Sequence, residues 1–133
     1  MHFLKYRLPQ TYHHFIQATL THDYTTCLPQ SIGFKHFITE PFLWFDLAKN
    51  TVSSLTLHPT MIMDRTLQKY NQLSPENAFL QIQEMIDETA KFNGHFVMLW
   101  HNSTLSEWKE WKGWRNVFEK SLEYLQQKQD SGK

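Results

Sequence analysis

Five apolar residues in succession, Phe96 to Trp100, constrain the fold of this chain more than any other feature of its 133-residue sequence. A strand with one wet face alternates apolar with polar residues, whereas an unbroken apolar run of this length is typical of a parallel strand covered on both faces. Parallel strands are joined by crossover connections that usually contain a helix. The run therefore predicts an α/β fold.

One helix is expected before this strand in the sequence and one after it. Ser74 can supply a capping hydroxyl, and Pro75 and Glu76 suit the first helical turn, so a helix is predicted to begin there. It should end near Gly94, which can adopt the left-handed conformation of a helix stop. A final helix should bury one apolar stripe, Trp111, Trp114, Phe118, Leu122 and Leu125. Residues 127–133 are expected to form a frayed polar tail.

The first half of the chain is less regular. Residues 2–7 predict a short strand, a helix should follow Pro9, residues 53–63 predict another strand and residues 66–70 a helical turn. The helix after Pro9 is expected to direct four residues inward, Tyr12, Phe15, Ile16 and Leu20. Residues 21–54 show no sustained period, and so long a segment usually lies over a functional site or contains short strands that its pattern does not resolve.

The composition excludes several classes of function. Thirteen basic residues balance thirteen acidic ones, so nucleic-acid and anionic-membrane binding lose their usual electrostatic driving force. No segment approaches the ~20 apolar residues of a membrane span or resembles a signal peptide, so a soluble single domain is expected. Cys27 permits no internal disulfide and has no basic neighbour, which favours a buried or loop thiol and a reducing, cytoplasmic compartment.

Polar residues that follow predicted strands are the first candidates for a functional site, because working residues of parallel α/β folds lie at strand ends. His101 and Asn102 follow the apolar run, and a histidine there can move protons or simply cap the strand. His58 is a second candidate of the same kind, at the strand end Leu57-His58-Pro59, and Asp64 follows it in the sequence. His58, Asp64 and His101 together have the composition of a two-histidine, one-carboxylate metal site, although the sequence does not show that they converge.

Aromatic residues after Pro41 form a second candidate surface. Trp44 and Phe45 belong to a stretch of four large apolar residues, Phe42 to Phe45, which is followed by Asp46. Such rings can stack on the apolar faces of sugars, or they can cover an open end of the core. The sequence leaves both interpretations open.

Taken together, motifs spread along the chain resemble the C-terminal half of the polysaccharide deacetylase-like proteins, the NodB-homology family. The resemblance runs from about His2 to Leu125, so residues 1–126 are assigned to it. It rests on Gly33-Phe34-Lys35, Pro41-Phe42 with Trp44-Phe45-Asp46-Leu47, His58-Pro59 with Met63-Asp64-Arg65-Thr66-Leu67, Tyr70, Leu73-Ser74-Pro75-Glu76, Leu99-Trp100-His101-Asn102-Ser103, Trp111 and Gly113-Trp114-Arg115.

The resemblance implies an incomplete (β/α) barrel and the removal of acetyl groups from N-acetylated sugars with a divalent, zinc-like metal. His101 matches the last-strand histidine that acts as general acid, and Asp23 matches the carboxylate of an intermediate motif. Trp44, Phe45, Asp23 and Asn102 are the expected substrate contacts. The family's metal and base motifs have no counterpart here, so this chain is expected to hold no metal of its own and to be inactive alone.

Two interpretations of this incompleteness follow. The chain is either a truncated frame or one half of a split enzyme whose first half is made separately, in which case it should associate with that half or with itself. The alternative is a non-catalytic carbohydrate- or partner-binding domain that retains the aromatic segment Phe42 to Phe45.

Overall fold

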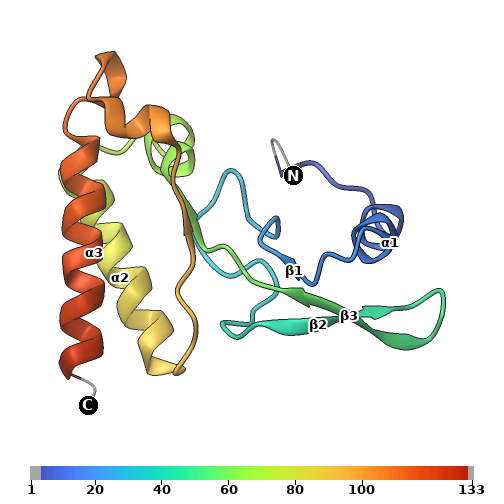
Figure 1. Ribbon diagram of the computed structural model, residues 1–133. Helices are drawn as coiled ribbons and strands as arrows, with labels where there is room; N and C mark the ends of the chain where they lie inside the picture. Colours follow the sequence, from blue (N-terminus) through green and yellow to red (C-terminus); the bar gives the residue numbers. More distant parts are fainter. Residues whose placement is uncertain (1–3, 132–133) are drawn as a thin grey trace.

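The computed structural model describes residues 4–131 (Figure 1). Two long helices, α2 and α3, pack side by side in one part of the molecule, and a three-stranded sheet with helix α1 forms the other. A short parallel pair of strands, β4 and β5, lies against the two long helices. The elements are α1 (Gln10–Gln17), β1 (His22–Asp23), β2 (Phe42–Asp46), β3 (Thr51–Leu57), β4 (Ile62–Met63), α2 (Pro75–Lys91), β5 (Met98–Leu99) and α3 (Trp114–Ser131).

The predicted α/β class is confirmed in this coarse form, with two small sheets in place of one. β3 is the centre of the first sheet, and it pairs parallel with β1 and antiparallel with β2. β4 and β5 form the second sheet and are parallel. No closed barrel is formed by residues 4–131. No helix in this described part has the length and apolarity needed to cross a bilayer.

The core lies mainly between the two long helices and the β4–β5 pair. Trp114 of α3 and Ile82 of α2 are completely or almost completely buried there, as is Ile62 of β4. A smaller apolar cluster around Tyr12 and Leu55 joins α1 to the three-stranded sheet. The fold therefore has two hydrophobic clusters. The chain passes from the smaller cluster to the larger one between β3 and β4.

The apolar run of residues 96–100 is a parallel strand, as predicted, but regular pairing covers only Met98–Leu99. Phe96, Met98 and Trp100 lie on the face that packs against the helix core. Leu99 points to the other face, where it lines an open cavity of about 440 Å³. The second face of this strand therefore borders a cavity instead of a second layer of helices.

Two sequence expectations about strands are wrong in the described part of the chain. Residues 4–7 form no strand, and His2 and Phe3 lie outside the described residues. The single strand expected over residues 53–63 is two strands, because the chain leaves β3 at His58 and re-enters regular pairing at Ile62. Residues 21–54 contain β1, β2 and the start of β3, so the alternative of unresolved short strands is confirmed there.

The helices begin largely as predicted. The Ser74 hydroxyl accepts a hydrogen bond from the Asn77 backbone N–H at 3.3 Å, and Pro75 is the first residue of α2. α1 follows Pro9 and buries Tyr12, whereas Leu20 lies beyond its end and is exposed. Residues 66–70 form one π-helical turn.

The C-terminal helix differs from the prediction at both ends. Trp111 belongs to a short 3₁₀ turn, and α3 starts at Trp114. Leu122 is exposed, and Val117 fills the core position nearer the start of the helix. α3 continues to Ser131, so residues 127–131 are helical and not a frayed tail. A Lys128–Asp87 ion pair at 2.8 Å ties this last part of α3 to α2.

Gly94 is required after α2 for a reason other than the predicted one. Asn93 takes the left-handed conformation, with φ of 53°. A Cβ atom on Gly94 would lie 2.4 Å from both Cβ and Oγ1 of Thr39. The residue is small because the loop that contains Thr39 crosses close to the end of α2.

Gly94→Ala is therefore expected to lower the free energy of unfolding by about 1–3 kcal/mol, the usual range for overpacking. Removing the Thr39 side chain in the same protein should recover part of that loss. Urea denaturation of Gly94→Ala, Thr39→Gly and the double variant measures the coupling between the two positions. Strictly additive losses would contradict a direct clash between these two residues.

Candidate functional site

Asp64 and His101 lie just past the carboxyl ends of two adjacent parallel strands, β4 and β5. Asp64 follows Met63, the last residue of β4, and His101 lies two residues after the end of β5. The register pairs Met63 with Leu99, so the two chains leave the sheet side by side. The prediction that His101 stands at the carboxyl end of a parallel strand is confirmed.

The Asp64 carboxylate is completely buried and accepts four hydrogen bonds. Its Oδ1 receives the Arg65 backbone N–H at 2.6 Å and is 2.7 Å from Nδ1 of His101. Its Oδ2 receives the His101 backbone N–H at 2.8 Å and the hydroxyl of Thr104. Each oxygen therefore has two partners, and the carboxylate joins β4, β5 and the turn after β5.

This arrangement fixes the His101 ring while leaving part of it accessible. Nδ1 faces Asp64, which accepts its proton, and about 38% of the side chain remains exposed. Nε2 is thereby the nitrogen available for proton exchange with a molecule outside the fold.

The three residues considered for a metal site do not assemble. His58 pairs with His22 and not with Asp64 or His101. The Asp64 oxygens already accept four hydrogen bonds, so they offer no free lone pair to an ion. Within residues 4–131 no three or more His, Cys, Asp or Glu side chains gather as metal ligands. The residues present in this site therefore do not fit the divalent metal that the resemblance implies.

Asp23 lies at the end of β1 and is buried on the side of the sheet that carries α1. Its Oδ1 accepts the Thr25 backbone N–H at 3.2 Å and the Thr25 hydroxyl. Its Oδ2 is buried without a hydrogen-bond partner among the described residues, and Asp23 lines the same cavity as Leu99. Burial, and then this carboxylate, raise the pKa of the Tyr12 phenol.

His58 lies beside His22 and Tyr24, two residues that line the same cavity as Asp23. Nδ1 of His22 and Nε2 of His58 are 2.8 Å apart, and the Tyr24 ring stacks on His58 at 4.1 Å between centroids. Burial and then His22 and His95 lower the pKa of His58, while Asp23 acts in the opposite direction. The folded protein therefore favours the neutral His58 imidazole.

Stability should consequently fall as the pH decreases below about 6.5, the ordinary histidine value. The pKa values of His58 and His36 are both lowered, in each case first by burial. In this window the unfolded chain binds more protons than the folded one, so stability rises with pH and is lost as acid is added. Urea midpoints measured from pH 8 to pH 5 should show this loss, and His58→Gln should flatten it. A midpoint that rises toward pH 5 would contradict the assignment.

The aromatic residues that were expected to contact substrate lie on β2. Trp44 is half-buried and packs edge-on against Tyr12 and His13, whereas 43% of Phe45 is exposed on the opposite face of the strand. The structure thus places Trp44 in the smaller core. Its ring contacts are with α1, which packs on the first sheet, while His101 follows β5 of the second sheet.

Asn102 begins the 3₁₀ turn that follows His101 and is exposed. Thr104, in the same turn, is fully buried against Asp64 and was missed by sequence reasoning. His22 was also missed as the partner of His58. No local sequence pattern marks either residue, because the partner of each lies more than 30 positions away in the sequence.

Cys27 is buried, as predicted, and burial raises the pKa of its thiol to about 11. The thiolate form is therefore scarce at neutral pH, and Cys27 is a poor nucleophile.

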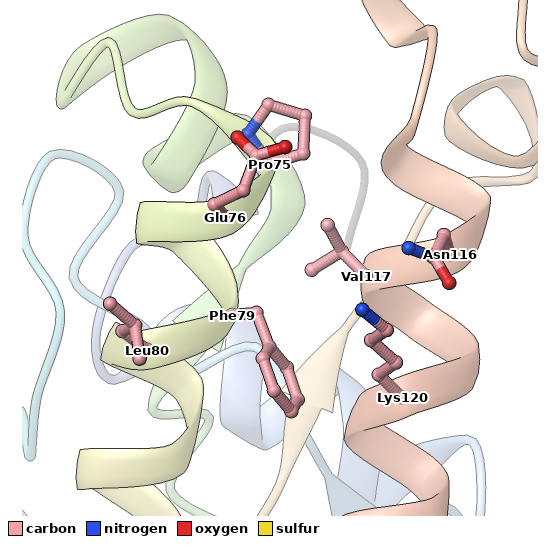
Figure 2. Close-up of a pocket in the computed structure, with 7 residues that line it drawn as sticks. All are labelled: Pro75, Glu76, Phe79, Leu80, Asn116, Val117 and Lys120. Atoms are coloured by element: carbon pink, nitrogen blue, oxygen red, sulfur yellow. The ribbon is translucent and has the colours of Figure 1, made fainter.

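A groove of about 240 Å³ between α2 and α3 contains none of the candidate catalytic, substrate-binding or metal-binding residues (Figure 2). Phe79 and Val117 lie between the two helices there, and Nζ of Lys120 is 5.9 Å from the Phe79 ring centre. The groove is mostly apolar and has no cluster of proton-transfer groups.

Comparison with known proteins finds no matching family model, no matching curated protein and no matching solved structure.

Proposed function

We propose that this chain is the C-terminal portion of a polysaccharide deacetylase-like hydrolase, in which His101 is the general acid. The observation that supports this most is the hydrogen bond between His101 Nδ1 and the buried Asp64 carboxylate at the ends of adjacent parallel strands. Strand ends are where parallel α/β folds hold reacting groups. The resemblance of the motifs around Asp64 and His101 supplies the substrate class, an N-acetylated sugar.

In this proposal Asp64 and His101 have separate tasks. Asp64 holds the ring through Nδ1 and stabilises its positive charge, and His101 donates the proton on Nε2 to the amine nitrogen as the amide C–N bond breaks. Proton donation to a leaving group contributes typically 10²–10⁴-fold to a rate. Activation of the attacking water requires groups that residues 4–131 do not assemble, so it is assigned to a separate N-terminal half.

The cavity between β1 and β5 supports the assignment of part of the site to a second chain. Asp23 lines it with one carboxylate oxygen unpartnered, and Leu99 lines it from the uncovered face of β5. A buried carboxylate oxygen without a partner normally costs stability, so a ligand or protein donor placed there would be bound favourably. On this ground we assign Asp23 to the substrate side of the assembled protein, and we assign Asn102 to it because Asn102 directly follows His101.

The experiment is co-production of this chain with a segment that carries the family's Asp and His motifs, followed by measurement of acetate release from the N-acetylglucosamine tetramer. The two chains together should release acetate and co-elute, while each alone should not. Release by this chain alone, or co-elution without any release, would contradict the proposal.

A non-catalytic carbohydrate- or partner-binding role is the second candidate, favoured by the exposed apolar residues of the β2–β3 hairpin. Leu47 at its tip is 87% exposed and Val52 is 57% exposed. A titration with the same tetramer, followed by tryptophan fluorescence and repeated with Phe45→Ala, tests carbohydrate binding at this hairpin. Loss of binding in Phe45→Ala with retained binding in Asn102→Ala would favour this role over the hydrolase.

A further inference from the structure

We propose that His22 and His58 form a chelating site for a divalent late transition-metal ion such as Cu²⁺ or Ni²⁺. The site is separate from the Asp64–His101 pair and does not depend on the function proposed above. It rests on the 2.8 Å separation of two imidazole nitrogens, Nδ1 of His22 on β1 and Nε2 of His58, the residue that follows β3.

The backbone places the two rings together. β1 and β3 are parallel, and His22 lies opposite Thr56. The Thr56 N–H donates to Thr21 O and the His58 N–H donates to Asp23 O, both at 2.8 Å. His58 is two residues beyond the partner of His22, so their side chains emerge on the same face of the sheet. His22 lies in β1 and the His58 backbone is hydrogen-bonded to β1, so the two histidines require less ordering on binding than two on a loop.

The separation of the nitrogens matches a particular coordination geometry. With metal–nitrogen bonds of about 2.0–2.1 Å, nitrogens 2.8 Å apart subtend roughly 85° at a shared ion. That is close to the right angle between neighbouring ligands in square-planar or octahedral complexes, which Cu²⁺ and Ni²⁺ favour. Tetrahedral Zn²⁺ would require the nitrogens to be roughly 3.3 Å apart.

The surroundings hold one ring in place and leave the other open to solvent. Tyr24 stacks on His58 with an interplanar angle of 13°, and the His58 carbonyl accepts the Thr26 hydroxyl at 3.0 Å. The second ring, His22, is exposed, so an ion can reach the pair from solvent.

Two protein ligands give a weak, exchangeable site in which water fills the remaining positions. His95 ion-pairs with Glu40 at 3.8 Å. Residues 4–131 gather no set of three or more His, Cys, Asp or Glu side chains around an ion, so the pair has no third ligand among them. Such an ion would be lost on dialysis, so the site differs from the tightly held metal that this chain is expected, from its sequence, to lack. The ion would join β1 to β3 and stabilise the first sheet.

Calorimetric titration of the full chain with Cu²⁺ and with Ni²⁺ at pH 7.5 tests the proposal. One equivalent of each should bind, and His22→Gln and His58→Gln should each weaken binding by at least the roughly 10- to 100-fold that loss of a supporting group costs at metal sites. His14→Gln is the matched control, because His14 is an exposed histidine on α1 outside the pair. It should bind like the parent chain.

Pulsed electron paramagnetic resonance of the Cu²⁺ complex gives a second readout that does not depend on affinity. Two coordinated imidazoles should be detected in the parent chain and in His14→Gln, and one in either single variant of the pair. Binding that survives both His22→Gln and His58→Gln, or a single imidazole in the parent chain, would overturn the proposal. If a variant fails to fold by circular dichroism, the parent chain's imidazole count still decides.

Discussion

Asp64→Asn is expected to lower the free energy of unfolding by about 3 kcal/mol, because each buried hydrogen-bonding group left unsatisfied costs roughly 1–3 kcal/mol. The carboxylate accepts from four donors, including both the backbone N–H and the ring of His101. An asparagine amide has one oxygen to accept with, and its NH₂ group would face donors. At least one donor must then lose its partner in a site that water does not reach.

A matched control is Asp87→Asn. Asp87 also joins two elements, since it accepts the Tyr124 hydroxyl and pairs with Lys128, but 39% of its side chain is exposed. Exposed ion pairs contribute only about 0–1 kcal/mol, so this change should be small. Urea denaturation of both variants at pH 7 gives the comparison. Equal losses for Asp64→Asn and Asp87→Asn would show that the buried carboxylate does not hold the two strand ends together.

The sequence predicted α2 well because its signals are local. Ser74, Pro75 and the apolar spacing that follows act within one or two turns, and no distant segment is needed to interpret them. The left-handed residue after the helix was wrongly predicted to be Gly94, because the constraint on Gly94 comes from a distant segment and not from a local signal. Gly94 is small because of Thr39, which is distant in sequence, while the left-handed turn is made by Asn93.

The amino-acid composition of the β2–β3 hairpin prevented its prediction from sequence. Large apolar side chains occupy both faces of β2, so the alternation between half-buried Trp44 and exposed Phe45 cannot be seen as a polar–apolar pattern. The turn after it is held by Asp46, whose Oδ1 accepts the Ala48 and Lys49 N–H groups. Burial opposes ionisation there, but the hydrogen bonds from His13 and from these N–H groups leave the pKa of Asp46 below its ordinary value.

The candidate site was predicted as separate residues and not as a pair. His101 and Asp64 each follow an apolar strand, which is a local signal, so both could be named. Their hydrogen bond depends on the register that sets Met63 opposite Leu99, and one residue of slip would move both side chains to other faces. His58 was grouped with them on composition alone, and the pairing of β1 with β3 gives it His22 instead.

His101→Asn is expected to reduce acetate release by the assembled two-chain protein 10²–10⁴-fold, the usual contribution of a general acid. Asparagine is a suitable replacement because its side-chain N–H can reproduce the Nδ1 hydrogen bond to Asp64, while it has no proton to donate to a leaving amine. Stability should therefore change little and the rate greatly. His14→Asn, on the exposed face of α1, is the control and should leave both unchanged. Acetate release by His101→Asn at the parent rate, with association of the two chains intact, would remove His101 from the chemistry and leave its bond to Asp64 as a structural link between β4 and β5.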